Sequence, residues 1–213
     1  MLNTAKVNAI IKILSSLYPN PQTELEFNTP FQLLIATILS AQCTDQRVNQ
    51  ITRKLFADYP TVEAMHQMPT AELESYIKTA GLWQMKAKNI KGTCAILISK
   101  YGGEVPQTRE ELMQLPGVGR KTANVVLANA FNIPAFAVDT HVHRVANRLG
   151  LACSKTPEQT EEQLMREIPP SLWKDAHHWL ILHGRRVCKA KKPQCNNCAL
   201  AHLCPSALTH QSD

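Results

Sequence analysis

Apolar residues recur at helical spacing along most of the chain. In the first segment they stand three or four positions apart, at Val7, Ile10, Leu14 and Leu17, and the same spacing returns in residues 48–55 and 87–101. Residues 31–39 are apolar nearly all round, which predicts a buried central helix. Only the short stretch 133–138 alternates as a strand does. The pattern therefore predicts an all-α fold.

Polar residues and glycines mark where these helices begin and end. Thr29 and Thr156 each precede a proline, and Thr108 stands three residues before Glu111 as in a capping box. Three glycines are expected to follow helix ends: Gly81, Gly102 and Gly150.

Composition narrows the class of protein. The chain has 213 residues, 44% of them hydrophobic and 19% charged, as in a globular protein. Its net charge of +6 favours a polyanionic partner. No apolar run reaches the roughly 18 residues of a membrane span, and the start lacks a signal-peptide core. We expect a monomer without membrane contact, in the cytoplasm and associated with the nucleoid, where the seven cysteines serve as ligands or core residues.

The stretch 115–123, Leu-Pro-Gly-Val-Gly-Arg-Lys-Thr-Ala, predicts a helix-hairpin-helix. One helix is expected to end at Leu115 and the next to span 120–132. Gly117 and Gly119 permit positive φ and a close approach of backbone N–H groups, including that of Val118, to an anion. With Arg120 beside them, they form a candidate site for a DNA phosphate. Alternatively, the turn only joins two packed helices.

Lys121, on the first turn of this second helix, and Asp139, beyond its end, are candidate reactive groups. Asp139 lies eighteen residues after Lys121, at the expected N-cap of another helix. The cap alone would explain the aspartate, and Lys121 could be a solvated lysine. His141, two residues further on, could line the same site, although such a histidine is more often structural or solvated.

Four of the cysteines form a C-x6-C-x2-C-x5-C array: Cys188, Cys195, Cys198 and Cys204. Four soft ligands so close in sequence can bind one metal centre, and the spacing leaves both an iron–sulfur cluster and zinc open. The other three, Cys43, Cys94 and Cys153, are expected to be packing residues. Between the first two ligands, a basic loop presents Lys189, Lys191 and Lys192 either to phosphates or to solvent.

Together, the LPGVGRKTA hairpin, the VDTHVHRV stretch and the terminal cysteine array resemble the endonuclease III family over nearly the whole chain. The resemblance implies two helical domains with the active site in the cleft between them. Residues 23–133 would form a barrel-like domain with the hairpin. Residues 1–22 and 134–213 would form the other, around a [4Fe–4S] cluster held by the four cysteines.

The resemblance also implies an activity, that of a bifunctional DNA glycosylase and AP lyase. Lys121 would be the nucleophile and Asp139 the catalytic carboxylate. Its substrates would be duplex DNA with oxidised pyrimidines or abasic sites. An amine is the group this chemistry needs, because it forms a Schiff base at the sugar C1′ that permits β-elimination. We expect Asp139 to face developing positive charge and not to pair tightly with Lys121.

A base inside a duplex must be flipped out before its sugar can be attacked. The resemblance assigns Gln42 and Leu82 as the side chains that fill the gap, and both are expected on loops just past helix ends. Trp83 replaces the tyrosine expected beside Leu82.

Two other functions compete with this one. A monofunctional adenine-mispair glycosylase would lack the lysine at position 121 and carry a further C-terminal domain, whereas here nine residues follow Cys204. A non-catalytic DNA-binding module stabilised by a metal would explain the hairpin, the charge and the cysteines. It would not explain why both Lys121 and Asp139 are present.

Overall fold

The computed structural model describes residues 4–209. Within that span the regular structure is α-helical and 3-10 helical without strands, which confirms the all-α prediction. The strand-like stretch 133–138 is an irregular connection. No described helix is both long and apolar enough to cross a membrane.

The chain divides into two compact units, and the second is continuous in sequence: unit 2 comprises Thr23–Ile133, and unit 1 comprises Met1–Gln22 with Pro134–Asp213. The helices of unit 2 are α2 (Pro30–Leu39), α3 (Asp45–Asp58), α4 (Val62–Gln67), α5 (Thr70–Ile77), α6 (Trp83–Tyr101), α7 (Arg109–Leu112) and α8 (Arg120–Ala130).

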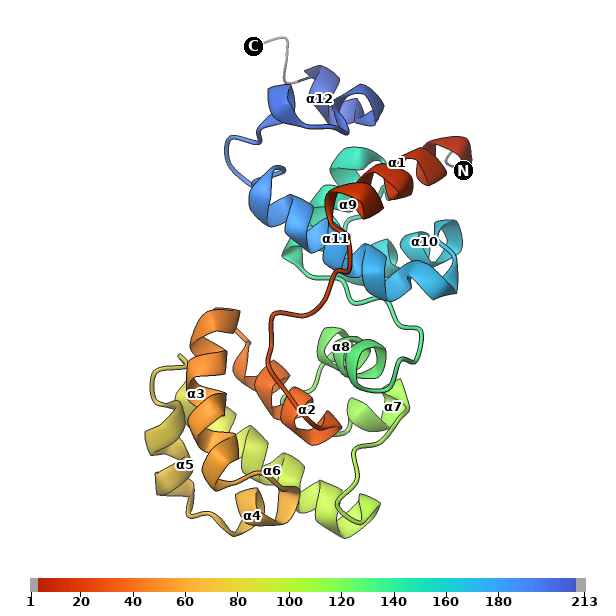
Figure 1. The fold of residues 1–213 in the computed structure, drawn as a ribbon. Coiled ribbons are helices and arrows are strands. Elements are labelled where there is room, and N and C mark those ends of the chain that lie inside the picture. Colours follow the sequence, from red (N-terminus) through yellow and green to blue (C-terminus); the bar gives the residue numbers. More distant parts are fainter. Residues whose placement is uncertain (1–3, 210–213) are drawn as a thin grey trace. The chain divides into compact units, whose positions relative to one another are not determined.

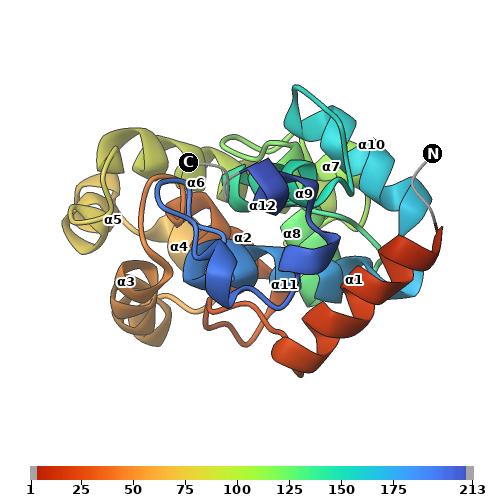
Figure 2. The ribbon, with the colours of Figure 1, turned by 90° about the horizontal axis from the view of Figure 1, so that it is seen from above.

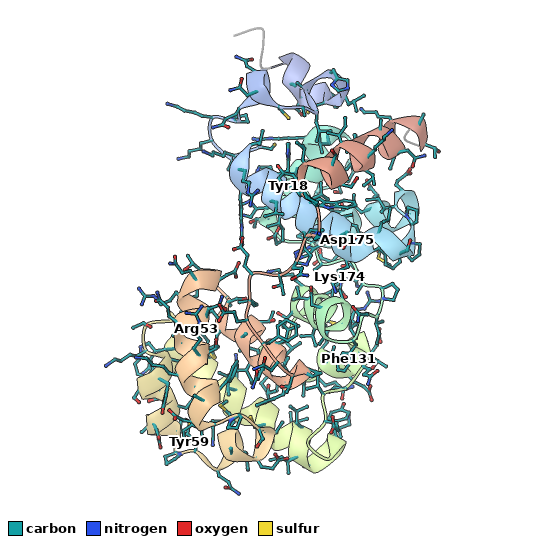
Figure 3. All side chains as sticks on the ribbon, viewed as in Figure 1. Tyr18, Arg53, Tyr59, Phe131, Lys174 and Asp175 are labelled. Carbon is teal, nitrogen blue, oxygen red and sulfur yellow. The ribbon has the colours of Figure 1, made fainter. Side chains whose placement is uncertain are left out.

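Helix α2 is the centre of unit 2. It contacts α3, α6 and α8 (Figure 1), and every residue from Phe31 to Leu39 is buried, as its all-round apolar sequence predicts. Helix α6 also packs against α4 and α5. A bidentate ion pair joins Arg53 of α3, labelled in Figure 3, to Glu26 before α2 at 2.5 and 2.6 Å. Because both side chains are exposed, this pair adds little stability.

Unit 1 is built from helices that come from both ends of the chain. They are α1 (Thr4–Leu17), α9 (Thr140–Leu149), α10 (Pro157–Glu167), η1 (Pro170–Leu172), α11 (Trp173–Arg186), η2 (Cys195–Asn197), η3 (Ala201–Leu203) and α12 (Pro205–Thr209). Helix α11 lies beside α9 and α1, while α10 and α12 pack on α9 (Figures 1 and 2). Their apolar faces enclose one core around Phe136, Val142 and Leu180.

The predicted helix starts are largely confirmed. Thr29, Thr108 and Thr156 each accept a hydrogen bond from the backbone N–H three residues on, which satisfies one of the donors left over at a helix start. Gly102 and Gly150 end α6 and α9 in left-handed conformation. The prediction for Gly81 is wrong, because α5 ends at Ile77 and the glycine lies in the turn before α6.

Candidate functional site

The hairpin connects α7 to α8, with a first helix shorter than predicted. Helix α7 ends at Leu112 instead of Leu115, because the amides of Gln114 and Leu115 bond to carbonyls three residues back, as in a turn. The Val118 N–H then donates to Leu115 O at 3.1 Å, which closes the loop before α8.

The two hairpin glycines meet different requirements. Gly117 has φ +77°, and a Cβ there would lie 2.7 Å from Asn89 Nδ2 on α6. Gly119 has φ −92° and ψ 177°, so it does not use the positive φ that a glycine permits: as the N-cap of α8 it has extended backbone. A Cβ at 119 would have no neighbour within 4 Å among the described residues. Packing explains the glycine at 117, whereas at 119 the bare position leaves the start of α8 open to a ligand.

Lys121 lies on the first turn of α8 and is exposed, directly after the hairpin. Neighbouring Arg120 is half-buried. The helix start places a partial positive charge at this position. A primary amine and an open anion site are thus within one helical turn of each other.

Asp139 is the N-cap of α9, as predicted. Its Oδ1 accepts hydrogen bonds from the N–H groups of His141 and Val142, both at 2.8 Å. Within residues 4–209, Oδ2 has no hydrogen-bond partner. The cap therefore holds the carboxylate by one oxygen and leaves the other available for chemistry.

His141 is held in place by Arg144, one turn along α9. Arg144 Nη2 donates to His141 Nδ1 at 3.1 Å and to the carbonyls of Gly184 and Cys188, both at 3.0 Å. Because a guanidinium can only donate, the contact between Arg144 Nη2 and His141 Nδ1 is a hydrogen bond in the histidine tautomer that carries its proton on Nε2. Arg144 thus couples α9 to the first cysteine of the array.

All four cysteines of the array line one pocket, which is partly open to solvent. Burial raises the pKa of the Cys198 and Cys204 thiols; backbone hydrogen bonds oppose this rise, and the nearby Cys188 and Cys195 thiols add to it. Among the described residues, no three His, Cys, Asp or Glu side chains converge as the ligands of a single ion. Four half-buried thiols around a shared pocket nevertheless form a set of soft ligands, which would suit a cluster of several metal atoms.

A buried histidine adjoins this pocket. His183 Nε2 lies 3.5 Å from Cys198 Sγ, and its Nδ1 lies 3.2 Å from the hydroxyl of Tyr18, labelled in Figure 3. Burial lowers the pKa of His183 to about 4, so the ring is neutral at pH 7. If the tyrosine donates to Nδ1, the Nε2–H group faces the sulfur.

The basic loop is anchored from α9. Arg148 donates to Lys189 O at 2.7 Å and to Ala190 O at 3.1 Å, and its Nη1 also lies 3.5 Å from Cys188 Sγ. The three lysines of the loop are exposed, and Lys192 adopts a positive φ of 52°. The backbone is therefore fixed while the cationic side chains face solvent.

Gln42 and Leu82 lie on loops before α3 and α6, in left-handed backbone with φ 53° and 52°. This conformation costs a residue with a Cβ about 1–2 kcal/mol. In residues 4–209, the other non-glycine residues with positive φ are Asn20, Asn132 and Lys192. The two loops are adjacent, because a Cβ on Gly81 would lie 3.7 Å from Gln42 O.

Several residues of the site were not predicted from the sequence. Met85, on the first turn of α6, is 60% exposed beside Leu82 at 58%. Its place one turn after Leu82 on a helical pattern could have indicated it. Arg144 and Arg148 left no such signal, since their contacts are to distant backbone carbonyls. Of the cysteines outside the array, Cys94 is buried as predicted, but Cys153 is exposed, because it lies in the loop after α9.

Known proteins are similar to this chain throughout its length. The HhH-GPD superfamily of base excision DNA repair proteins matches residues 35–170. Endonuclease III of Synechocystis sp. is 51% identical over 203 residues, 95% of this chain and 93% of the relative. The solved structure of a non-covalent endonuclease III–DNA complex covers 100% of both chains, with 46% identity and a TM-score of 0.95.

A second solved structure is that of a trapped endonuclease III–DNA covalent intermediate, an estranged-adenine complex. It is 47% identical, with a TM-score of 0.94 over 99% of this chain and 100% of that one. Identity near one half over almost the entire length far exceeds a likeness of fold alone. The chain therefore belongs to the endonuclease III family, within the HhH-GPD superfamily of base excision DNA repair proteins.

Proposed function

We propose that this protein is a bifunctional DNA glycosylase and AP lyase. It removes oxidised pyrimidines from duplex DNA and cleaves 3′ of the resulting abasic site, acting as a monomer on nucleoid DNA in the cytoplasm. The observation that carries the proposal is the exposed primary amine of Lys121 directly after an open glycine hairpin. Relatives named endonuclease III, and a relative trapped covalently on DNA, support it.

Lys121 is the proposed nucleophile. Its neutral amine attacks the sugar C1′, the bond from C1′ to the base breaks, and the base leaves with the bonding electrons and takes up a proton. The attached nitrogen loses a proton and forms an iminium with C1′ as the C1′–O4′ bond of the sugar ring breaks and O4′ takes up a proton. The iminium makes the C2′ proton acidic enough for β-elimination of the 3′ phosphate. Hydrolysis of the iminium finally releases the lysine.

Asp139 is the proposed catalytic carboxylate. Its capping bonds fix Oδ1 and thereby the direction of Oδ2. In that position Oδ2 can stabilise positive charge developing on the sugar or move a proton through water. His141, held by Arg144, belongs to the same helical turn and is proposed to contact DNA.

The hairpin is the proposed phosphate site. The start of α8 and the backbone at Gly117 and Gly119 offer N–H groups, and Arg120 adds a positive charge. The Val118 N–H, which the sequence also predicted to approach the phosphate, instead donates to Leu115 O, so Val118 would line the site without donating to it. Lys189, Lys191 and Lys192 of the anchored loop are proposed to contact other phosphates. Binding of this kind is independent of sequence and weakens steeply as salt rises.

Gly119→Ser is expected to weaken binding of damaged and undamaged duplex alike by about tenfold, because a hydrogen bond to a charged group contributes roughly 1.5–3 kcal/mol. The serine hydroxyl would cap α8 and occupy the anion position, so the melting temperature should be unchanged or slightly higher. Fluorescence anisotropy with labelled duplex measures the affinity.

Gly117→Ala is the control for this prediction. Its Cβ would clash with Asn89 at a positive φ, so this variant should instead lower the melting temperature. Normal DNA affinity in Gly119→Ser would count against the hairpin as a phosphate site.

Gln42 and Leu82 are the proposed insertion residues. Both are exposed on adjacent loops with strained backbone, a combination that suits entry into a duplex after a nucleotide has been flipped out. Met85 extends the same apolar surface.

The four array cysteines are proposed to hold a [4Fe–4S] cluster. Such a cluster takes one thiolate at each iron, so its ligands surround a volume, as the four thiols that line the pocket do. When bound, the group would cross-link the C-terminal segment and neutralise the mutual repulsion of the thiolates. Arg144, Arg148 and His183 support this segment through Cys188 and Cys198.

The purified protein is expected to be brown and to contain about four irons and four sulfides per chain. Colour separates the two candidates, because an iron–sulfur cluster absorbs visible light and a zinc site does not. Cys198→Ser should lose most of the visible absorbance and lower the melting temperature. Cys153→Ser, at an exposed cysteine outside the array, should keep both. Metal analysis that finds one zinc and no iron would overturn the cluster assignment.

The proposed function is tested by borohydride reduction during incubation with a duplex that contains an oxidised pyrimidine. A covalent adduct is expected, because borohydride reduces the iminium to a stable amine. Base release without an adduct would instead indicate a monofunctional glycosylase. DNA binding with neither base release nor adduct would indicate a non-catalytic binding module.

A further inference from the structure

Lys86 on α6 is a buried lysine without a part in the proposed chemistry. Only 3% of its surface is exposed. Lysine is almost never buried to this extent unless its ammonium group is paired, because the charge loses its hydration. Burial lowers the pKa of Lys86, whereas Cys43 acts in the opposite direction. A residue so costly to bury needs an explanation in its contacts.

The Lys86 ammonium binds two backbone carbonyls from different parts of unit 2. Nζ donates to Leu39 O at 2.8 Å and also to Ala80 O. Leu39 is the last residue of α2, and Ala80 closes a turn after α5 through its own N–H bond to Ile77 O. Carbonyls at the ends of helices and turns carry partial negative charge, so both favour a cation.

These two carbonyls come directly before the insertion loops. Gln42 follows Leu39 by three residues, and Leu82 follows Ala80 by two. One ammonium group therefore joins the starts of two loops that lie 47 and 6 residues from it in sequence. Both loops carry a strained left-handed residue, and strain of that kind persists only where the surroundings hold it.

We propose that Lys86 is a positioning residue for nucleotide extrusion: its buried ammonium holds the Gln42 and Leu82 loops together so that both side chains enter the duplex as one unit. The inference rests on the proposed function of those two residues. Fixing the loops before binding reduces the ordering that the complex would otherwise require. Without the ammonium, each loop would be free to relax from its left-handed conformation.

The same helix offers a matched control in Lys91. Its Nζ donates to Met68 O at 2.6 Å, to Met65 O at 3.3 Å and to His66 O, so it too binds carbonyls at a helix end. Those carbonyls belong to α4 and the residue after it, where no DNA contact is proposed. Lys91→Met should lower stability without a specific effect on extrusion.

The test compares Lys86→Met and Lys91→Met on two substrates. Excision of an oxidised pyrimidine from duplex DNA requires extrusion, whereas cleavage at an abasic site in single-stranded DNA does not. In single-turnover kinetics, Lys86→Met should slow duplex excision on the order of 10²-fold, because a small misplacement of the insertion residues has an effect of that size. Cleavage of the single strand should slow by less than about threefold. Fluorescence of 2-aminopurine beside the lesion should show extrusion lost in parallel.

A double-mutant cycle with Leu82→Ala separates positioning from general stability. If Lys86 acts through the loops, Lys86→Met should cost little more once Leu82 has been removed. Losses that multiply to within about twofold would overturn the proposal. An equal duplex-specific loss in Lys91→Met would do so as well.

Two further outcomes are distinguishable. If Lys86→Met does not fold, the cycle is run with Lys86→Arg, whose longer side chain displaces both carbonyls while it keeps the charge. That variant should show a smaller loss with the same coupling to Leu82→Ala, and additive losses would again refute the role. Failure of the proposed function would differ from all of these, because the unmodified protein would excise no base from the duplex.

Discussion

Lys121→Gln is expected to abolish the borohydride-trapped adduct and to slow β-elimination by at least about 10³-fold, because the amide cannot form a Schiff base. Lys121 is exposed on the first turn of α8, so the substitution should change stability by less than about 0.5 kcal/mol. Gel analysis of the trapped complexes measures the chemical step. Anisotropy measurements on a duplex with a stable abasic analogue measure binding separately.

Lys121→Arg is the control that separates nucleophilicity from charge. Arginine keeps the positive charge next to the hairpin but stays protonated and does not attack C1′. We expect it to be as inactive as Lys121→Gln while it binds DNA more tightly than that variant. If Lys121→Arg retained cleavage, the lysine would act as a cation, and the nucleophile would be another group.

Asp139→Asn is expected to lower turnover by about 10²–10⁴-fold while duplex affinity stays within about threefold. Asparagine caps helices about as well as aspartate, so the two hydrogen bonds from His141 and Val142 should persist. The substitution therefore removes the charge and leaves the start of α9 intact. Single-turnover excision and the melting temperature are the measurements, and near-normal turnover would refute the catalytic role.

Asp139→Ala completes the comparison. It removes the charge and the cap together, and loss of the cap should cost about 1 kcal/mol. The melting temperature should fall only in this variant, while turnover falls in both. If turnover fell only in Asp139→Ala, the role of Asp139 would be to cap α9 and not to take part in catalysis.

Much of the fold could be predicted from the sequence because its signals are local. Thr29, Thr108 and Thr156 cap helices through backbone groups three residues away, and Asp139 does the same. These bonds need no distant partner, so residue type and spacing are sufficient. The end of α7 was predicted wrongly, and the sequence could not decide the φ of Gly119, since both depend on how the turn between the helices closes.

Candidate residues were also evident from the sequence, but their surroundings were not. The spacing of the four cysteines predicted a metal centre and left its kind open. The tertiary structure adds the pocket that all four line and the Arg144 and Arg148 bonds that anchor Cys188 and the residues after it. Similarly, Gln42 and Leu82 came from family resemblance, whereas their strained backbone and adjacency are seen only in three dimensions.

The sequence by itself determined the helical class, the capped helix starts, the glycine hairpin before Lys121 and the cysteine array, because each is set by residues a few positions apart. The tertiary structure alone decided which carbonyls Lys86 binds and which loops it joins, since its partner Leu39 lies 47 residues away. Such contacts depend on how helices pack. Packing is a property of the whole unit, so no local pattern records it.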